Sequence, residues 1–237
     1  MIGQKKYSLF LSQKEICLGI AYLLVSRFLL PYVIAIAASL IGLHDASSLN
    51  LAYNAANVIF CIWVFRKLLM QSITQVKYRF KKTFQTALYA ALFILICISV
   101  VNVAIYSIWP EFNNGNNSSI IQMAVSSPWS ILCQTVILAP IAEECIFRGL
   151  LFTAFYHKNP IYGYVCSATV FSFVHLVGFL GSAEPLSLLL SFIQYLPSGF
   201  ILAWVLAHTN TLIGPMLTHS FINAFSLFSI FVQMQTS

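Results

Sequence analysis

Apolar stretches of about 20 residues recur along this chain of 237 residues, and they leave few architectures open to it. A helix of that length crosses the roughly 30 Å hydrocarbon core of a bilayer. Hydrophobic residues make up 59% of the chain and charged residues only 8%, whereas a soluble domain carries about 25% charged residues. One apolar run at the N-terminus would indicate a secretory signal, but here the runs continue to the C-terminus. The chain is therefore predicted to be a multi-pass membrane protein.

We expect an all-α, polytopic transmembrane helical bundle of about seven spans, with a range of six to eight, forming one integral membrane domain over residues 1–237. Each span must be helical, because unpaired backbone groups are too unfavourable in lipid. The overlong first run contains Arg27 and Pro31, and it is expected to be tilted or partly interfacial. The predicted spans are Ile16–Leu43, Leu51–Met70, Phe84–Trp109, Trp129–Tyr156, Ile161–Leu180, Leu186–Ala207 and Leu212–Val232.

The net charge of +6 indicates a membrane topology signal and no nucleic-acid partner. With seven spans, the loop Lys and Arg residues all fall on one side, which predicts a cytoplasmic N-terminus in the cell membrane. The opposite loops carry Asp45, Glu111 and Glu184. One of them, "PEFNNGNNSS", is rich in Gly and Asn and is expected to be a flexible surface loop. The basic residues are Lys5, Lys6, Lys14, Arg66, Lys67, Lys77, Arg79, Lys81, Lys82 and Lys158.

The six cysteines all lie within apolar runs, and no CxxC pair is present. This pattern favours neither a disulfide framework nor a zinc ribbon, and it predicts buried cysteines that act as small hydrophobic residues.

Few ionisable residues lie inside the predicted spans, and a charge at the bilayer centre is unfavourable enough to mark a functional candidate. Arg27 is best interpreted as structural, because its long side chain can reach the interface. His208 lies near a span end. The others fall in three segments, "EECIFR", "FSFVH" and "HSFIN", and they are Glu143, Glu144, Arg148, His175 and His219.

Helical spacing places the polar groups of each segment on one face. Glu144 and Arg148 are four residues apart, the favoured order for a helical ion pair. Glu143 is five residues from Arg148, about 140° around the helix. The spacing of four recurs in Phe171 with His175 and in His219 with Asn223. Three helices are therefore predicted to offer polar groups to a common interior, with Glu144 paired to Arg148 and Glu143 left for chemistry.

The three segments resemble the EExxxR, FxxxH and HxxxN motifs of the CPBP family, which groups CAAX prenyl proteases with bacteriocin-processing and self-immunity (Abi) membrane proteins. They occur in the family's order on successive helices, within a motif-bearing core of about residues 129–232. The short chain is more similar to the bacterial, Abi-like branch. The N-terminal half is similar only in being hydrophobic.

This resemblance implies an intramembrane endopeptidase of the glutamate type that acts on a peptide or membrane-associated protein in the lipid bilayer. Glu143 and His175 would activate a water. His219 and Asn223, both neutral, would stabilise the oxyanion. Glu144, Arg148 and Phe171 would support them. No cofactor is implied, and the role would be in peptide or bacteriocin processing or self-immunity.

Three other functions compete with this one. A zinc metallopeptidase would use Glu and His ligands, but the chain lacks HExxH and its candidates are scattered over three helices. A non-catalytic immunity protein would bind a peptide or partner without needing the full Glu, His, His and Asn set. A transporter or channel would also place polar residues at mid-membrane, but no inverted repeat is visible in the sequence.

Overall fold

The computed structural model describes residues 7–236, and every regular element in that range is a helix. An all-α polytopic bundle is therefore confirmed. The elements are α1 (Gln13–Phe28), α2 (Leu30–Leu40), α3 (Ala46–Val64), α4 (Arg66–Ile108), α5 (Gly115–Ser126), α6 (Pro128–Leu132), η1 (Cys133–Leu138), α7 (Ala139–Glu144), η2 (Cys145–Phe152), α8 (Thr153–Tyr156), α9 (Pro160–Val174), η3 (Val177–Phe179), α10 (Pro185–Thr209) and α11 (Ile213–Thr236).

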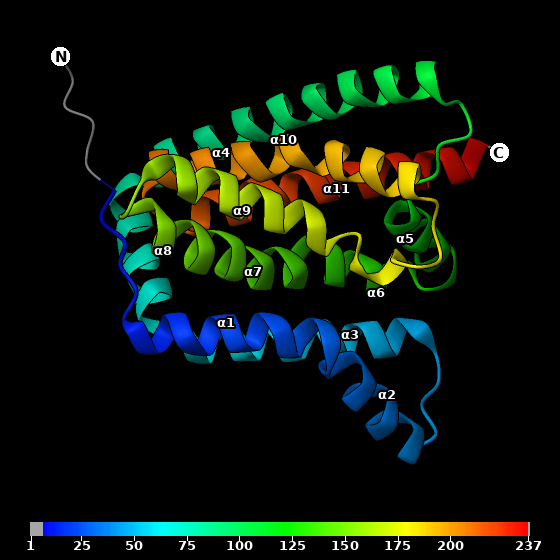
Figure 1. The fold of residues 1–237 in the computed structure, drawn as a ribbon, viewed down its shortest axis with the longest axis horizontal. Helices are drawn as coiled ribbons and strands as arrows, with labels where there is room; N and C mark the ends of the chain where they lie inside the picture. The colour runs from blue at the N-terminus through cyan, green and yellow to red at the C-terminus, as the bar shows by residue number, and fades with distance from the viewer. Residues whose placement is uncertain (1–6, 237) are drawn as a thin grey trace.

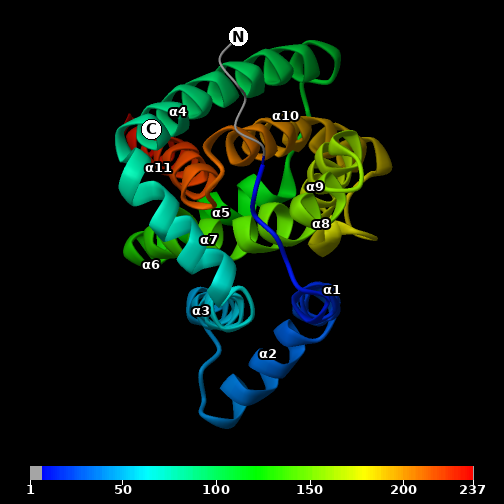
Figure 2. The same cartoon turned by 90° about the vertical axis from the view of Figure 1, so that its left-hand side faces the viewer.

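Five helical segments in the described range are long and apolar enough to cross a membrane, and the bent pair α1 and α2 makes a sixth. The segment from α6 to α8 counts as one of these spans, Pro128–Tyr156. The remaining predicted span, Leu51–Met70, corresponds to most of α3, a helix of 19 residues that is not among those segments, and to the start of α4. In the ribbon, α3 runs alongside α1, along the long axis of the bundle (Figures 1 and 2).

The bend between α1 and α2 measures 55° and lies at Leu29. Pro31 occupies the first turn of α2 and has no backbone N–H to offer to the preceding turn. Since proline is the usual cause of a sharp kink, the overlong first run is bent where it was expected to be tilted. Helix α2 then leaves the bundle and contacts mainly α1 and α3 (Figure 2).

A break at Arg79, where φ is −139° and ψ is 24°, divides α4 into two parts. Residues 66–78 cross one end of the bundle, and residues 80–108 then run its length (Figure 1). The sequence predicted a loop over most of 71–83, but this stretch is helical. Its basic residues lie on a helix that follows the end of the bundle.

The ends of the bundle differ in charge, as the sequence predicted. Helix α1 begins, α3 ends and α9 begins at the same end, which we call the basic end (Figure 1). The loops at the other end carry Asp45, Glu111 and Glu184. Lys5 and Lys6 lie outside the described residues. The described cations at the basic end are Lys14 of α1, Lys158 of the turn between α8 and α9, and, in α4, Arg66, Lys67, Lys77, Arg79, Lys81 and Lys82.

The segment between α4 and α5 differs from the flexible surface loop that was expected. Asn114 is only 5% exposed, and its side-chain oxygen accepts hydrogen bonds from the backbone of Asn116 and Asn117. It therefore caps α5, which begins at Gly115. The clustered asparagines form a helix start because an Asn side chain at this position satisfies free backbone N–H groups.

The motif-bearing helices occupy the middle of the bundle. Helix α9 packs against α10 at Gly199, where an added Cβ would lie 2.8 Å from the Cα of Ala168. Helix α11 packs against α4 and α10 and also contacts α7. One apolar core includes residues from all of these helices and from α1 and α3. The polar side chains of the three motifs therefore lie inside a continuous apolar core.

Candidate active site

The glutamate motif lies in a helix that is wound more widely than an α-helix on both sides of it. Helix α7, which ends with Glu143 and Glu144, is preceded by the π-helix η1 and followed by the π-helix η2. The hydroxyl of Thr153 donates to the carbonyl of Arg148, five residues earlier, at 3.0 Å. Short π-helical turns are frequent at functional sites, and here they flank the residues that the motif singles out.

Glu144 is the centre of a fully buried ionic cluster. Its Oε1 accepts from Nη1 of Arg148 at 3.0 Å and from Nδ1 of His219 at 2.8 Å. The predicted pairing of Glu144 with Arg148 is therefore confirmed. The contact with His219 was not predicted, and it joins α7 to α11.

Arg148 fixes three helices to one another. Its Nη2 donates to the carbonyl oxygens of Gly199 at 3.1 Å and Ser198 at 3.5 Å, both on α10. Its guanidinium lies 4.5 Å from the ring centroid of Phe171, on α9. Such a contact with an aromatic face stabilises a desolvated cation. The Arg148 side chain has no exposed surface, so its place is structural support within the protein interior.

Glu143 faces a different partner. Its Oε2 lies 3.9 Å from Nε2 of His175, too far for a direct hydrogen bond and close enough for one small group to contact both atoms. The side chains of Glu143 and His175 are 19% and 14% exposed, whereas those of Glu144 and Arg148 are 0% exposed. The two adjacent glutamates therefore lie in different surroundings, as the helical spacing predicted.

His175 is held in a defined orientation. It caps the C-terminus of α9, and its Nδ1 lies 2.8 Å from the carbonyl oxygen of Phe171. A carbonyl only accepts, so Nδ1 carries the hydrogen and the neutral ring presents an unprotonated Nε2 to Glu143. The ring of Phe171 lies 4.6 Å from that of His175 between centroids. This is the tautomer that can accept a proton on the side facing Glu143.

The two candidate residues of α11 both form hydrogen bonds to the span that carries the glutamates. Asn223 donates through Nδ2 to the carbonyl oxygen of Thr135, in η1, at 2.7 Å, which leaves its second N–H. Because Glu144 also pairs with Arg148, it is an ionised carboxylate, and Nδ1 of His219 must donate to it. A neutral His219 then has no hydrogen on Nε2. With this tautomer a neutral His219 does not donate to an oxyanion from Nε2, and its expected role stays a prediction.

The structure brings six of the seven candidate residues into one chain of contacts. It leads from Glu143 to His175, and through Phe171 and Arg148 to Glu144 and His219. Asn223 is attached at η1. Sequence reasoning missed Tyr195, whose ring stacks on His175 with centroids 4.3 Å apart. The one signal for it was a tyrosine inside an apolar run, two residues before Pro197.

Arg27 is half-buried near the end of α1. Among the described residues it forms no ion pair, and its guanidinium lies 6.0 Å from the ring centroid of Tyr53. The interpretation of Arg27 as a structural residue stays a prediction.

The candidate residues do not converge on a metal position. Within the described part of the chain, no three His, Cys, Asp or Glu side chains are grouped so that they could hold a metal ion. Glu143 with His175 and Glu144 with His219 form separate pairs. The donor set of a catalytic zinc site, three protein ligands and a water, does not fit this arrangement.

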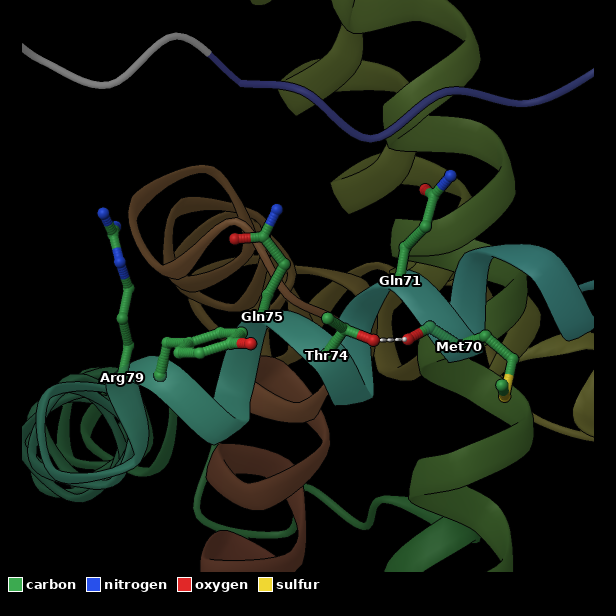
Figure 3. Close-up of a pocket in the computed structure, with 6 residues that line it drawn as sticks. Met70, Gln71, Thr74, Gln75 and Arg79 are labelled. Atoms are coloured by element: carbon green, nitrogen blue, oxygen red, sulfur yellow. Dashed lines mark hydrogen bonds between the residues drawn. The ribbon is translucent and has the colours of Figure 1, made fainter.

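A separate pocket of about 600 Å³ lies along the first part of α4. Figure 3 shows Gln71, Gln75 and Arg79 projecting in a similar direction from this helix. Thr74 donates instead to the carbonyl of Met70 at 2.9 Å. None of the motif residues lines this pocket, so it is distinct from the candidate active site.

Comparison with known proteins supports the motif reading. Residues 124–225 match a family model described as "Type II CAAX prenyl endopeptidase Rce1-like", and this segment contains all seven candidate residues. The "Putative membrane peptidase YdiL" of Bacillus subtilis (strain 168) is 31% identical over 111 residues, which are 46% of this chain and 41% of that protein. The "UPF0177 protein YxdF" of Lactococcus lactis subsp. lactis (strain IL1403) is 33% identical over 98 residues, 40% of this chain and 49% of that protein.

These relatives are matched over less than half of their own length. No solved structure matches the chain. The resemblance to CAAX-type membrane proteases that the three motifs indicated is thus confirmed over the segment that carries them.

Proposed function

We propose that this chain, whose residues 124–225 carry an Rce1-like domain, is a membrane-embedded endopeptidase in which Glu143 and His175 activate a water. The observation that carries the proposal is the pairing of a partly exposed Glu143 with the Nε2 of an oriented His175 at 3.9 Å. A water bound by both atoms would lie within hydrogen-bond distance of each. The name of the Bacillus subtilis relative, a membrane peptidase, supports the same activity.

In the proposed reaction, Glu143 takes a proton from this water, and the water oxygen attacks the carbonyl carbon of the scissile peptide bond. His175 holds the water and the developing hydroxide in place. The tetrahedral intermediate then collapses, the C–N bond breaks, and the leaving amine takes the proton from Glu143. All atoms and protons of this reaction come from the peptide, the water and Glu143, so no cofactor is needed. The products are a carboxylic acid and an amine.

Asn223 is the better candidate for the neutral oxyanion donor. One of its amide hydrogens is used by Thr135, which fixes the amide plane and leaves the other hydrogen for substrate. His219 can donate to the same oxygen from Nε2 only as an imidazolium, whose charge Glu144 would stabilise. A preorganised donor is favoured because it needs no rearrangement as charge develops.

Glu144, Arg148 and Phe171 then support the reacting groups from within the core. The cluster of Glu144 with Arg148 and His219 has a permanent negative partner for its cations, so it can persist in a water-poor interior. Phe171 contacts both the guanidinium of Arg148 and the ring of His175. These residues would set the distance between the helices that carry Glu143 and His175.

The substrate we propose is a peptide or a membrane-associated protein cleaved within the cell membrane. A role in peptide or bacteriocin processing or in self-immunity is consistent with the motif family. We propose that prenylation of the substrate is not required, because both of the relatives described above are bacterial proteins.

Cells that express the chain provide the test. The membrane fraction of cells with the native protein is compared with that of cells with Glu143→Gln, and new peptide termini are identified by mass spectrometry. We expect termini that appear only with the native protein and are also absent with His175→Ala. Equal sets of termini in all three samples would refute the peptidase. A protective role that survives in both variants would favour a non-catalytic immunity protein.

A further inference from the structure

The ring of Tyr195 forms one wall of the position that His175 occupies. The two rings are stacked, with centroids 4.3 Å apart and an interplanar angle of 27°. Tyr195 comes from α10, whereas His175 ends α9, so the contact fixes a side chain from outside its own helix. Within residues 7–236, the His175 ring has one hydrogen bond, which goes to Phe171 and holds Nδ1 alone. Tyr195 therefore restricts the tilt that this single hydrogen bond would leave free.

The hydroxyl of Tyr195 forms hydrogen bonds with two asparagines that are not among the candidate active-site residues. It accepts a hydrogen bond from Nδ2 of Asn116 at 3.0 Å and donates to Oδ1 of Asn114 at 3.4 Å. Its donor and one of its acceptor positions are thus used by the protein. Tyr195 is therefore not placed as an acid or base, and it acts through the position of its ring.

The hydroxyl is held in place by residues 114–116, the cap of α5 and its first two residues, which we call the α4–α5 turn. Within it, Asn114 is buried, caps α5 and donates through Nδ2 to Gln194, the residue before Tyr195. Gln194 in turn donates to Asn102 of α4 at 2.6 Å. The turn is therefore anchored to α4, α5 and α10 before it contacts Tyr195.

The same turn also reaches the chain just after His175. At Gly115, an added Cβ would lie 2.6 Å from Cδ1 of Phe179, in η3. That distance is shorter than real Cβ contacts allow, so only glycine lets the ring of Phe179 lie there. The turn thus supports His175 by two independent routes, through Tyr195 and through the segment that follows His175.

We propose that Tyr195 is a positioning residue for His175 and that the α4–α5 turn (114–116) sets it in place. This inference rests on the proposed function for its effect on catalysis, but not for its effect on the His175 ring. His175 is proposed to hold the attacking water beside Glu143, and correct orientation of that water contributes strongly to rate. A misplaced His175 should therefore lower kcat and leave KM almost unchanged.

The first measurement does not depend on activity. In protein labelled with ¹³C and ¹⁵N at histidine and held in nanodiscs, the ring signal of His175 is assigned by its loss in His175→Gln. We expect Tyr195→Leu, which removes the ring current, and Asn116→Ala to move this signal. Asn113→Ala is the matched control, since Asn113 is exposed and accepts from Ser118 rather than contacting Tyr195. An unmoved His175 signal in Asn116→Ala would overturn the proposal.

The second measurement is cleavage kinetics with a peptide identified by the terminus mapping. Tyr195→Phe keeps the ring and the fold but loses the hydroxyl, and we expect about a 3–10-fold lower kcat at unchanged KM, the size of one or two neutral hydrogen bonds. Tyr195→Leu should lose roughly 100-fold. Full activity of Tyr195→Leu would refute the positioning role. One further outcome separates the two proposals. If neither the native protein nor any variant cleaves a peptide, but the His175 signal moves in Asn116→Ala, the proposed function fails and the positioning of His175 stands.

Discussion

Nδ1 of His219 lies 2.8 Å from Oε1 of Glu144, the same oxygen that accepts from Arg148. One carboxylate oxygen therefore joins α7, η2 and α11. The three motifs are not three independent contributions to a cavity, because the last motif is held in place by the first. Glu144, expected to be a supporting residue, therefore fixes the position of His219, expected to be a catalytic one.

Glu144→Gln should destabilise the protein strongly, because it leaves Arg148 buried without a negative partner and removes the acceptor for His219. Loss of one partner of a buried ion pair typically costs about 3–5 kcal/mol. Thermal unfolding in detergent measures the effect. The double change Glu144→Gln with Arg148→Gln should recover part of the lost stability, and Glu143→Gln should cost little. A stable but inactive Glu144→Gln beside an active Glu143→Gln would assign the base to Glu144.

Asn223→Ala should lower kcat by roughly 10²–10³, the usual effect of removing one oxyanion donor. The peptide cleavage assay measures this, with thermal unfolding as a check on folding. Asn54→Ala is a suitable control, because Asn54 also uses its amide on a backbone carbonyl, that of Asn50, but belongs to α3 and to none of the motifs. An equal loss of kcat in both variants would show a general packing effect and remove Asn223 from the oxyanion site.

Peptide cleavage should persist in EDTA or phenanthroline. The reason is the donor set of the described residues, in which Glu143 with His175 and Glu144 with His219 form separate pairs. The rate is compared before and after chelation, and again after zinc is added back. If zinc alone restores a lost activity, then Glu143, His175 and His219 must be reassigned as ligands.

The basic end of the bundle should face the cytoplasm, because loop Lys and Arg residues favour that side. A variant without the six native cysteines is given one new cysteine, at Lys81 on the basic end or at the exposed Asn117 on the other. A membrane-impermeant thiol reagent added to intact cells should label Asn117→Cys, while Lys81→Cys should react only after the cells are opened. The reverse pattern would invert the topology.

Much of the fold was predictable because membrane burial imposes helices on every long apolar run. The ion pair of Glu144 with Arg148 followed from a spacing of four, and the separation of Glu143 from it followed from helical geometry. These are properties of one helix. Local spacing therefore predicted them well.

Contacts between helices were less predictable. Nothing in "HSFIN" indicates that His219 bonds to Glu144, because that contact depends on how α11 packs against α7. Tyr195 was missed for the same reason, since its partners His175 and Asn116 are distant in the chain. The asparagine-rich turn was mistaken for flexible loop because composition does not distinguish a solvated amide from a buried helix cap.

The wide winding of η2 gives the chain a place where it can lose a residue. Each π-helical turn holds more residues than an α-helical turn over the same part of the helix. A one-residue deletion between Leu150 and Phe152 would let this stretch relax toward ordinary winding and would leave the EExxxR spacing untouched. The residues that follow, including Tyr156, which packs against Tyr7 and Phe152, would then keep their direction around the helix axis. The same deletion in an ordinary α-helix would rotate them by about 100°. A chain one residue shorter at this point can therefore keep the same packing against the N-terminal segment.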